Sequence, residues 1–231
     1  MSYYLGLFIK RNRKLRKMFV SQPKYIDDII EKYELIDLEI YPSTPMAYYI
    51  SKEKEKIYYL DTKGIKDYQS RIGSLLFLAI MSRPDILFAV QCCSRFSKDP
   101  TNENLKAVNR ILYYIKGTKD KGIQFHSDNG VILHATVDVS YATHADMKSH
   151  TGMTLHIGNH SGACLAQSKK QTIIADSSTV AELIGTHTIS KEILWARRFL
   201  ASIGYEQKQP TVLYEDNMST ISMIKNKSNE W

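Results

Sequence analysis

The second half of the chain alternates short apolar runs with one long helical stretch, and this order restricts the fold more than any other feature. The apolar runs have the residue alternation and β-branched content of strands, and turn residues separate them. The helical stretch ends at a glycine, Gly204. Three strands, a long helix, a strand and a final helix are expected in this order, over residues 131–139, 151–158, 162–168, 179–203, 211–214 and from 219. This order predicts an α/β (α+β) domain in which helices flank a mixed sheet.

The first half of the chain is predicted to be mostly helical after an N-terminal β-hairpin. The hairpin strands are expected at 3–9 and 18–21, with a basic segment between them. Pro42 and Pro45 favour a surface loop over residues 41–67. Helices are expected over residues 22–33, 66–82, 84–97 and 102–117, and a short strand over residues 122–126.

Charge is divided unevenly between these halves. Residues 1–126 carry 22 lysines and arginines against 14 acids, whereas residues 127–231 carry 9 against 10. The turn at 127–130 separates the two regions and predicts a domain boundary at residue 127. A basic region joined to a nearly neutral one favours a polyanionic partner.

The cysteine count and the length of the apolar runs exclude two classes of protein. The three cysteines, Cys92, Cys93 and Cys164, do not form a disulfide framework, which favours a reducing compartment. The longest apolar run, 72–81, is shorter than the roughly 20 residues that a membrane span needs. The sequence therefore predicts neither a secreted disulfide-rich protein nor a membrane protein.

Three acidic residues stand where side chains from separate elements can converge. Asp138 lies between Val137 and Val139 in an apolar strand, where an unpaired carboxylate is costly unless a cation neutralises it. Glu182 lies in the opening turn of the long helix, and Asp216 follows the last strand. Carboxylates from a strand, a helix start and a strand end can meet at one point. Such a cluster can hold divalent metal ions, which suits phosphodiester hydrolysis.

Two of these acids also have simpler structural explanations. The segment Thr179–Glu182 matches a capping box, in which the glutamate bonds to a backbone N–H at the helix start. Asp216 could cap the final helix. The metal-site hypothesis therefore depends on the combination of acids. The scattered histidines of this half lack the spacing of a zinc site.

Basic residues at two places are candidate contacts for nucleic acid. The segment between the first two strands holds six cations and no acid, and it could bind phosphates or form a solvated turn that keeps a sheet edge soluble. A lysine pair before the long helix could touch a phosphate backbone or form an exposed loop. Trp195, late in that helix, is expected to pack in the core, with base stacking as the alternative. The candidate nucleic-acid-binding residues are Lys10, Arg11, Arg13, Lys14, Arg16, Lys17, Lys169 and Lys170.

Motifs in both halves resemble the C-terminal part of copia-type LTR-retrotransposon polyproteins, and the match extends over nearly the whole chain. Those of the first half resemble the thumb and connection that follow the reverse transcriptase palm. They are Tyr4–Gly6 with the basic hairpin, Ser43–Met46, Tyr68–Leu76, Arg83–Ile86 and Ile111–Thr118. Those of the second half resemble the family's ribonuclease H domain. They are Lys148–Gly152, Gln167–Gln171, Ser177–Glu182 and Asp216–Ile221.

The resemblance implies a specific fold and chemistry. It implies a thumb/connection-like region over 1–126 and, over 127–231, a ribonuclease H-like domain with a mixed sheet and flanking helices. Ribonuclease H cuts the RNA strand of an RNA–DNA hybrid with two Mg²⁺ or Mn²⁺ ions. The catalytic and metal-ligand roles fall on Asp138, Glu182 and Asp216. The implied partners are the hybrid and the remainder of the polyprotein, and the implied location is intracellular, in cytoplasmic retroelement particles or the nucleus.

The sequence also departs from the family pattern. It begins after the polymerase's paired aspartates. It ends before the domain's last strand, last helix and fourth acidic ligand, so weak or absent turnover is expected. Val180 replaces an acid common in the motif, and Ser140 stands where many relatives have another acid. The alternative is a catalytically inactive nucleic-acid-binding remnant of a retroelement polyprotein. An unrelated metal-dependent phosphatase would need a small-substrate pocket, and the basic first half argues against it.

Overall fold

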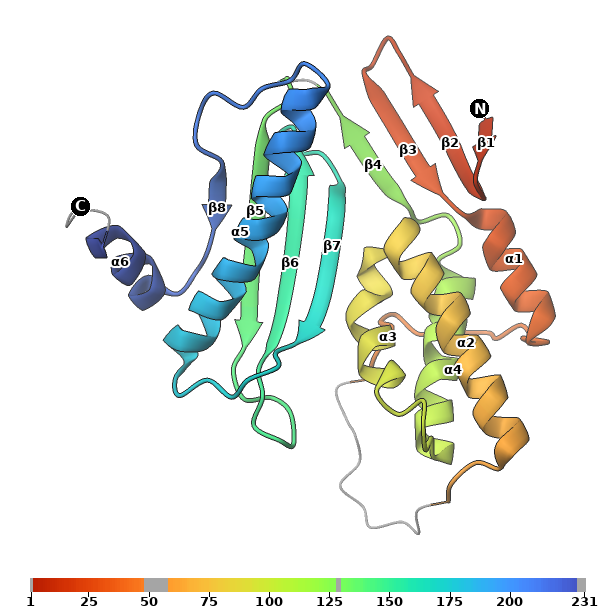
Figure 1. Ribbon diagram of the computed structural model, residues 1–231. Coiled ribbons are helices and arrows are strands. Elements are labelled where there is room, and N and C mark those ends of the chain that lie inside the picture. Colours follow the sequence, from red (N-terminus) through yellow and green to blue (C-terminus); the bar gives the residue numbers. More distant parts are fainter. Residues whose placement is uncertain (1, 48–57, 128–129, 228–231) are drawn as a thin grey trace. The chain divides into compact units, whose positions relative to one another are not determined.

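The computed structural model describes residues 2–47, 58–127 and 130–227. This part of the chain contains two sheets and six α-helices, as expected for an α+β protein (Figure 1). Two compact units divide the chain: Met1–Arg11 with Met18–Ile123, and Asn12–Lys17 with Gln124–Trp231. The boundary at residue 127 stays a prediction. Residues 48–57 of the expected surface loop lie outside the described residues. No described helix combines the length and the apolar character that crossing a membrane requires.

The N-terminal sheet differs from the sequence prediction in its first strand. The sheet order is β1-β2-β3-β4, with β1 Ser2–Tyr4, β2 Leu7–Asn12, β3 Lys17–Ser21 and β4 Ile123–His126. The expected single strand over 3–9 is wrong, because Leu5 and Gly6 form a two-residue turn between β1 and β2. Their φ angles are 48° and 80°, and positive φ at both positions is the geometry of a tight hairpin turn. The basic segment does form the tip between β2 and β3.

Four helices follow the hairpin, and their starts depend on local capping. They are α1 Pro23–Lys32, α2 Thr62–Met81, α3 Leu87–Ser94 and α4 Asn102–Gly117, with a short 3-10 turn at Pro84–Ile86. Helix α2 begins four residues earlier than expected because the Asp61 carboxylate accepts a hydrogen bond from Gly64 N at 2.7 Å. Thr101 and Asn104 form a capping box that fixes the start of α4.

The second sheet has the order β7-β6-β5-β8. Its strands are β5 Leu133–Ser140, β6 His150–Ile157, β7 Ala163–Lys170 and β8 Val212–Tyr214. Strands β5, β6 and β7 are antiparallel neighbours, whereas β8 lies parallel to β5. Helix α5 (Ser178–Ser202) lies along one face of this sheet, and α6 (Met218–Lys227) follows β8 (Figure 1). Parallel pairing requires a crossover between the two strands, and α5 is part of that crossover.

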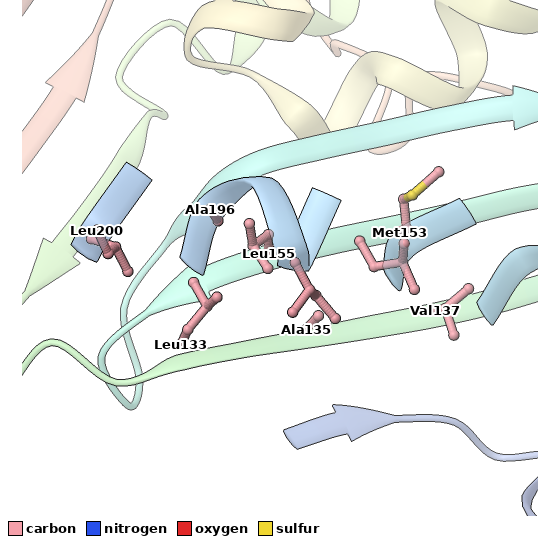
Figure 2. Packing of buried hydrophobic residues seen from close by; sticks show 9 residues of the cluster. Leu133, Ala135, Val137, Met153, Leu155, Ala196 and Leu200 are labelled. Carbon is pink, nitrogen blue, oxygen red and sulfur yellow. The ribbon is translucent and has the colours of Figure 1, made fainter. Parts of the chain in front are cut away.

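The core of this sheet lies under α5. Side chains of β5 alternate, so that Leu133, Ala135 and Val137 are buried and Asp138 is exposed. Figure 2 shows the buried side chains of β5 and β6 lying between the strands and the helix. The nine buried residues of the cluster are Leu133, Ala135, Val137, Met153, Leu155, Ile189, Ile193, Ala196 and Leu200. This packing fixes α5 on β5, and with it the start of the helix that carries Glu182.

Candidate metal centre

Neither simpler explanation for the acids agrees with the structure. Ser177 is the N-cap of α5, and its hydroxyl accepts a hydrogen bond from Val180 N at 3.2 Å. Glu182 is therefore not part of a capping box. At the start of α6 the capping residue is Asn217 and not Asp216, because the side-chain oxygen of Asn217 accepts a hydrogen bond from Thr220 N at 3.0 Å. Both acids are free for another role.

The three predicted acids come together at one point. One carboxylate oxygen from each of Asp138, Glu182 and Asp216 lies within 4.8 Å of the others. Strand β8 pairs with β5 only as far as Thr136, opposite Tyr214. Beyond that pair, Val139 N donates to Glu182 Oε1 at 3.3 Å, so the helix side chain reaches the backbone of β5.

Glu182 carries the electrostatic strain of this cluster. Glu182 is buried, with only 5% of its surface exposed. Burial and, after it, the charges of Glu215, Asp138 and Asp216 together raise the pKa of Glu182 to about 7, although the hydrogen bond from Val139 N lowers it. Its Oε2 atom is buried and has no hydrogen-bond partner among the described residues. A buried acceptor without a donor, surrounded by like charges, fits a cation ligand.

Glu215 is a fourth carboxylate near the site that sequence reasoning missed. Its Oε2 accepts from Thr186 Oγ1 at 3.2 Å, and its Oε1 accepts from Asn217 N at 2.9 Å. Burial aside, its charge is the largest cause of the raised pKa of Glu182. The adjacent pair Glu215-Asp216 was the available signal, but the contact with Thr186 depends on the packing of α5.

The predicted nucleic-acid contacts differ in their surroundings. All six cations of the hairpin, Lys10 to Lys17, are exposed. Lys169 and Lys170 end β7 and do not form a loop. Lys169 is exposed, whereas Lys170 forms an ion pair of 2.6 Å with Asp146.

Two further side-chain expectations can be compared with the structure. The expected core position of Trp195 is wrong, since this residue is 61% exposed. The helix turns its neighbour Ala196 into the core instead.

Two of the scattered histidines form hydrogen bonds within the second sheet and the loop beside it. His150 bonds His144 at 3.0 Å and Ser168 at 2.7 Å. Among the described residues, the acid cluster is the one group that could hold a metal ion.

The fold and this cluster define an α+β protein with a carboxylate site suited to a divalent cation. Relatives that match nearly the whole chain include retrovirus-related Pol polyproteins of plant transposons, and the chain is a retrotransposon-derived protein. It is 36% identical over 227 residues to the Pol polyprotein from transposon TNT 1-94 of Nicotiana tabacum, covering 96% of this chain and 17% of the relative. It is 34% identical over 230 residues to that from transposon RE1 of Arabidopsis thaliana, covering 97% of this chain and 15% of the relative.

A shorter relative matches most of its own length. An uncharacterised mitochondrial protein of Arabidopsis thaliana is 28% identical over 195 residues, which cover 84% of this chain and 78% of the relative. No family model matches the chain, and no solved structure matches it. The chain spans less than a fifth of the length of these two polyproteins.

Proposed function

We propose that this chain is a ribonuclease H of copia-type retrotransposon origin, which hydrolyses the RNA strand of RNA–DNA hybrids. The observation that carries the proposal is the convergence of Asp138, Glu182 and Asp216 within 4.8 Å. The similarity to retrovirus-related Pol polyproteins supports it, because the motifs around Glu182 and Asp216 resemble the ribonuclease H domain of that family. The positive net charge of +7 suits a polyanionic substrate.

Asp138, Glu182 and Asp216 could together hold a divalent ion such as Mg²⁺ or Mn²⁺, and the resemblance to ribonuclease H implies two such ions. Carboxylate oxygens are the ligands that these hard cations prefer, and Glu182 Oε2 accepts no hydrogen bond from the residues that the structure describes. When bound, such ions would act as Lewis acids on the phosphodiester and lower the pKa of water.

The chain itself holds the carboxylates in position. The Val139 N–H fixes one oxygen of Glu182 and leaves the other for a cation. Glu215 bonds both Thr186 of α5 and the backbone of Asn217, which ties the turn that carries Asp216 to the helix. Asp138 lies on the exposed side of β5, where a polymeric substrate can reach it. Preorganised ligands of this kind lower the cost of ordering the site when the substrate binds.

A cleavage assay on an RNA–DNA hybrid with end-labelled RNA tests the proposal. We expect cleavage in Mg²⁺ or Mn²⁺, none in chelator, and loss to background in Asp138→Asn. The matched control is Asp120→Asn, an exposed aspartate of the first unit, which should cleave like the wild type. Equal cleavage by wild type and Asp138→Asn would overturn the assignment of this site.

Hybrid binding without cleavage is the outcome that favours the alternative function. The six exposed cations of the hairpin are the observation behind it. In that case binding should weaken steeply with salt and should not depend on divalent ions. The chain would then be a retroelement-derived nucleic-acid-binding protein, and the hydrolase proposal would fail.

A further inference from the structure

The outer face of α5 carries large side chains that the core does not use. Leu194, Trp195 and Phe199 are 56%, 61% and 48% exposed. The core-facing side of the same helix is formed by other residues, such as Ile193 and Ala196. A helix packed on one sheet needs a single apolar face. A second cluster of exposed apolar side chains on it indicates a binding surface.

Trp195 and Phe199 form one continuous aromatic surface. Their ring centroids are 5.6 Å apart and their planes differ by 5°. Residues four apart lie one above the other on a helix, so this stacking follows from their spacing. Rings held in a fixed orientation lose less conformational freedom when a further flat group stacks on them.

The exposed charges of α5 beside this pair have one sign. Lys191 precedes Trp195 by one turn, and Arg198 lies between the two aromatic positions; both cations are exposed. Among the described residues, neither of them forms an ion pair. No exposed residue of α5 is acidic, because Glu182 is buried and Glu192 is half-buried and bonded to Gln167.

We propose that the α5 outer face, formed by Lys191, Leu194, Trp195, Arg198 and Phe199, binds single-stranded nucleic acid. Stacked aromatic rings between cations are what such surfaces use, with bases on the rings and phosphates on the cations. A duplex keeps its bases stacked on each other and cannot offer them to Trp195. The two exposed charges of this face, Lys191 and Arg198, are both positive, which favours a polyanion over a protein partner, whose surface carries both signs.

The size of the face fits a short stretch of one strand. Lys191 and Arg198 are seven residues apart, which is about 10 Å along a helix. At roughly 3.4 Å per stacked nucleotide, this distance corresponds to about three nucleotides. The surface is separate from the acid cluster, and binding to it requires neither a metal ion nor hydrolysis.

Tryptophan fluorescence tests the proposal directly. The chain has two tryptophans, so Trp231→Phe leaves Trp195 as the one source of tryptophan fluorescence. Titration is done in chelator, in an Asp138→Asn background, with single-stranded 12-mers of DNA and of RNA and with a blunt duplex as comparison. We expect saturable quenching by the single strands and little by the duplex. If neither the single-stranded DNA nor the single-stranded RNA quenches this fluorescence, the proposal is overturned, whatever the result of the cleavage assay.

Three substitutions of Trp195 separate stacking from simple apolar contact. In an anisotropy assay with labelled oligonucleotide, Trp195→Ala should weaken binding roughly 5- to 100-fold, the range found when a stacking ring is removed. Trp195→Phe should keep most of the affinity, whereas Trp195→Leu, which keeps apolar surface without an aromatic face, should behave like alanine. Tyr205→Ala, an exposed aromatic residue beyond the helix, is the matched control and should change affinity less than twofold.

Two other outcomes would contradict the binding of single-stranded nucleic acid by this face. If Trp195→Leu binds as well as the wild type, the face is not a stacking surface. If the fluorescence of Trp195 changes with protein concentration alone, and Trp195→Ala abolishes a dimer seen by sedimentation, the face is an interface between copies of this chain. Either result overturns nucleic-acid stacking on α5.

Discussion

At the scale of single residues, the site is defined by a glutamate placed where its charge is unfavourable. Glu182 is buried beside three other acids, and its pKa is raised to about 7. Without a cation, the folded protein must keep a proton on it or bear the cost of a buried charge. This strain is a common property of functional sites.

The stability of the metal-free protein should therefore depend on pH through Glu182. Between about pH 4.5 and pH 7, the folded protein keeps a proton that the unfolded chain releases, so the free energy of unfolding falls as pH rises. Above pH 7 the loss is complete. We expect Glu182→Gln to be more stable than the wild type by about 1–3 kcal/mol at pH 8. Near pH 5 the difference should vanish, as urea unfolding in chelator can measure.

Two comparisons make that result specific. Glu206→Gln, at an exposed acid beyond α5, should keep the pH profile of the wild type. Adding Mg²⁺ at pH 8 should stabilise the wild type and not Glu182→Gln, because the ion binds only the folded site. A wild type whose stability does not fall between pH 5 and pH 8 relative to Glu182→Gln would contradict the assigned burial of this charge.

The sequence was sufficient to predict that Asp138, Glu182 and Asp216 lie close together, but it did not predict their neighbours. Asp138 was recognisable because a carboxylate within an apolar strand needs a reason. The capping-box reading of Glu182 failed because Ser177, two residues before Thr179, caps the helix. Glu215 was missed since its bond to Thr186 joins two elements whose packing no local pattern encodes. Trp195 was misplaced for a related reason, because an apolar residue on a helix can face a partner as well as a core.

At the scale of elements, a close approach of α5 to β5 positions Glu182. A Cβ atom on Gly185 would lie 2.7 Å from Val139 Cγ2 and 3.1 Å from Val137 Cγ2. A β-branched side chain on a strand has little freedom to move aside. The glycine therefore sets the distance between the helix and the strand that together hold two of the three acids.

Gly185→Ala should damage both the fold and the site. Overpacking should lower the free energy of unfolding by about 1–3 kcal/mol. Cleavage of the hybrid should fall by up to about 100-fold if the helix shifts Glu182 by roughly 1 Å. Thermal unfolding and the cleavage assay measure the two effects.

Gly73→Ala is the matched control for this substitution. Gly73 lies inside α2, and a Cβ there meets nothing within 4 Å. Alanine should then stabilise the protein by about 0.5–1 kcal/mol, because glycine is the poorer helix former. Equal stabilisation by both substitutions would mean that α5 does not approach β5 as closely as described.

The pattern of apolar residues predicted most elements and failed where backbone conformation decided the outcome. Residues 102–117 form α4 over the expected length, because periodicity and a capping residue agree. The expected strand over 3–9 divides at Leu5, a residue that rarely adopts positive φ and gives no turn signal. The early start of α2 depends on the capping bond of Asp61, which the loop composition concealed.

At the scale of the whole molecule, the positive net charge matters most where cations gather on an exposed segment. The net charge is +7, and six of the cations lie in the exposed segment Lys10–Lys17. None of these six forms an ion pair within the described residues. Unpaired cations held on a hairpin are available for phosphates, and each phosphate contact releases counterions.

Neutralising this hairpin should reduce the salt dependence of nucleic-acid binding. A variant with Arg13→Gln, Lys14→Gln and Arg16→Gln should lower the slope of log K against log salt concentration by about 2–3 for an RNA–DNA hybrid. The control variant carries Lys63→Gln, Lys66→Gln and Lys98→Gln at exposed lysines elsewhere, so that both variants lose three charges. Titration at several salt concentrations, in chelator, measures both slopes. Because net charge is matched, a difference between the variants reports contact at the hairpin, whereas equal slopes would mean that these cations only keep the tip between β2 and β3 solvated.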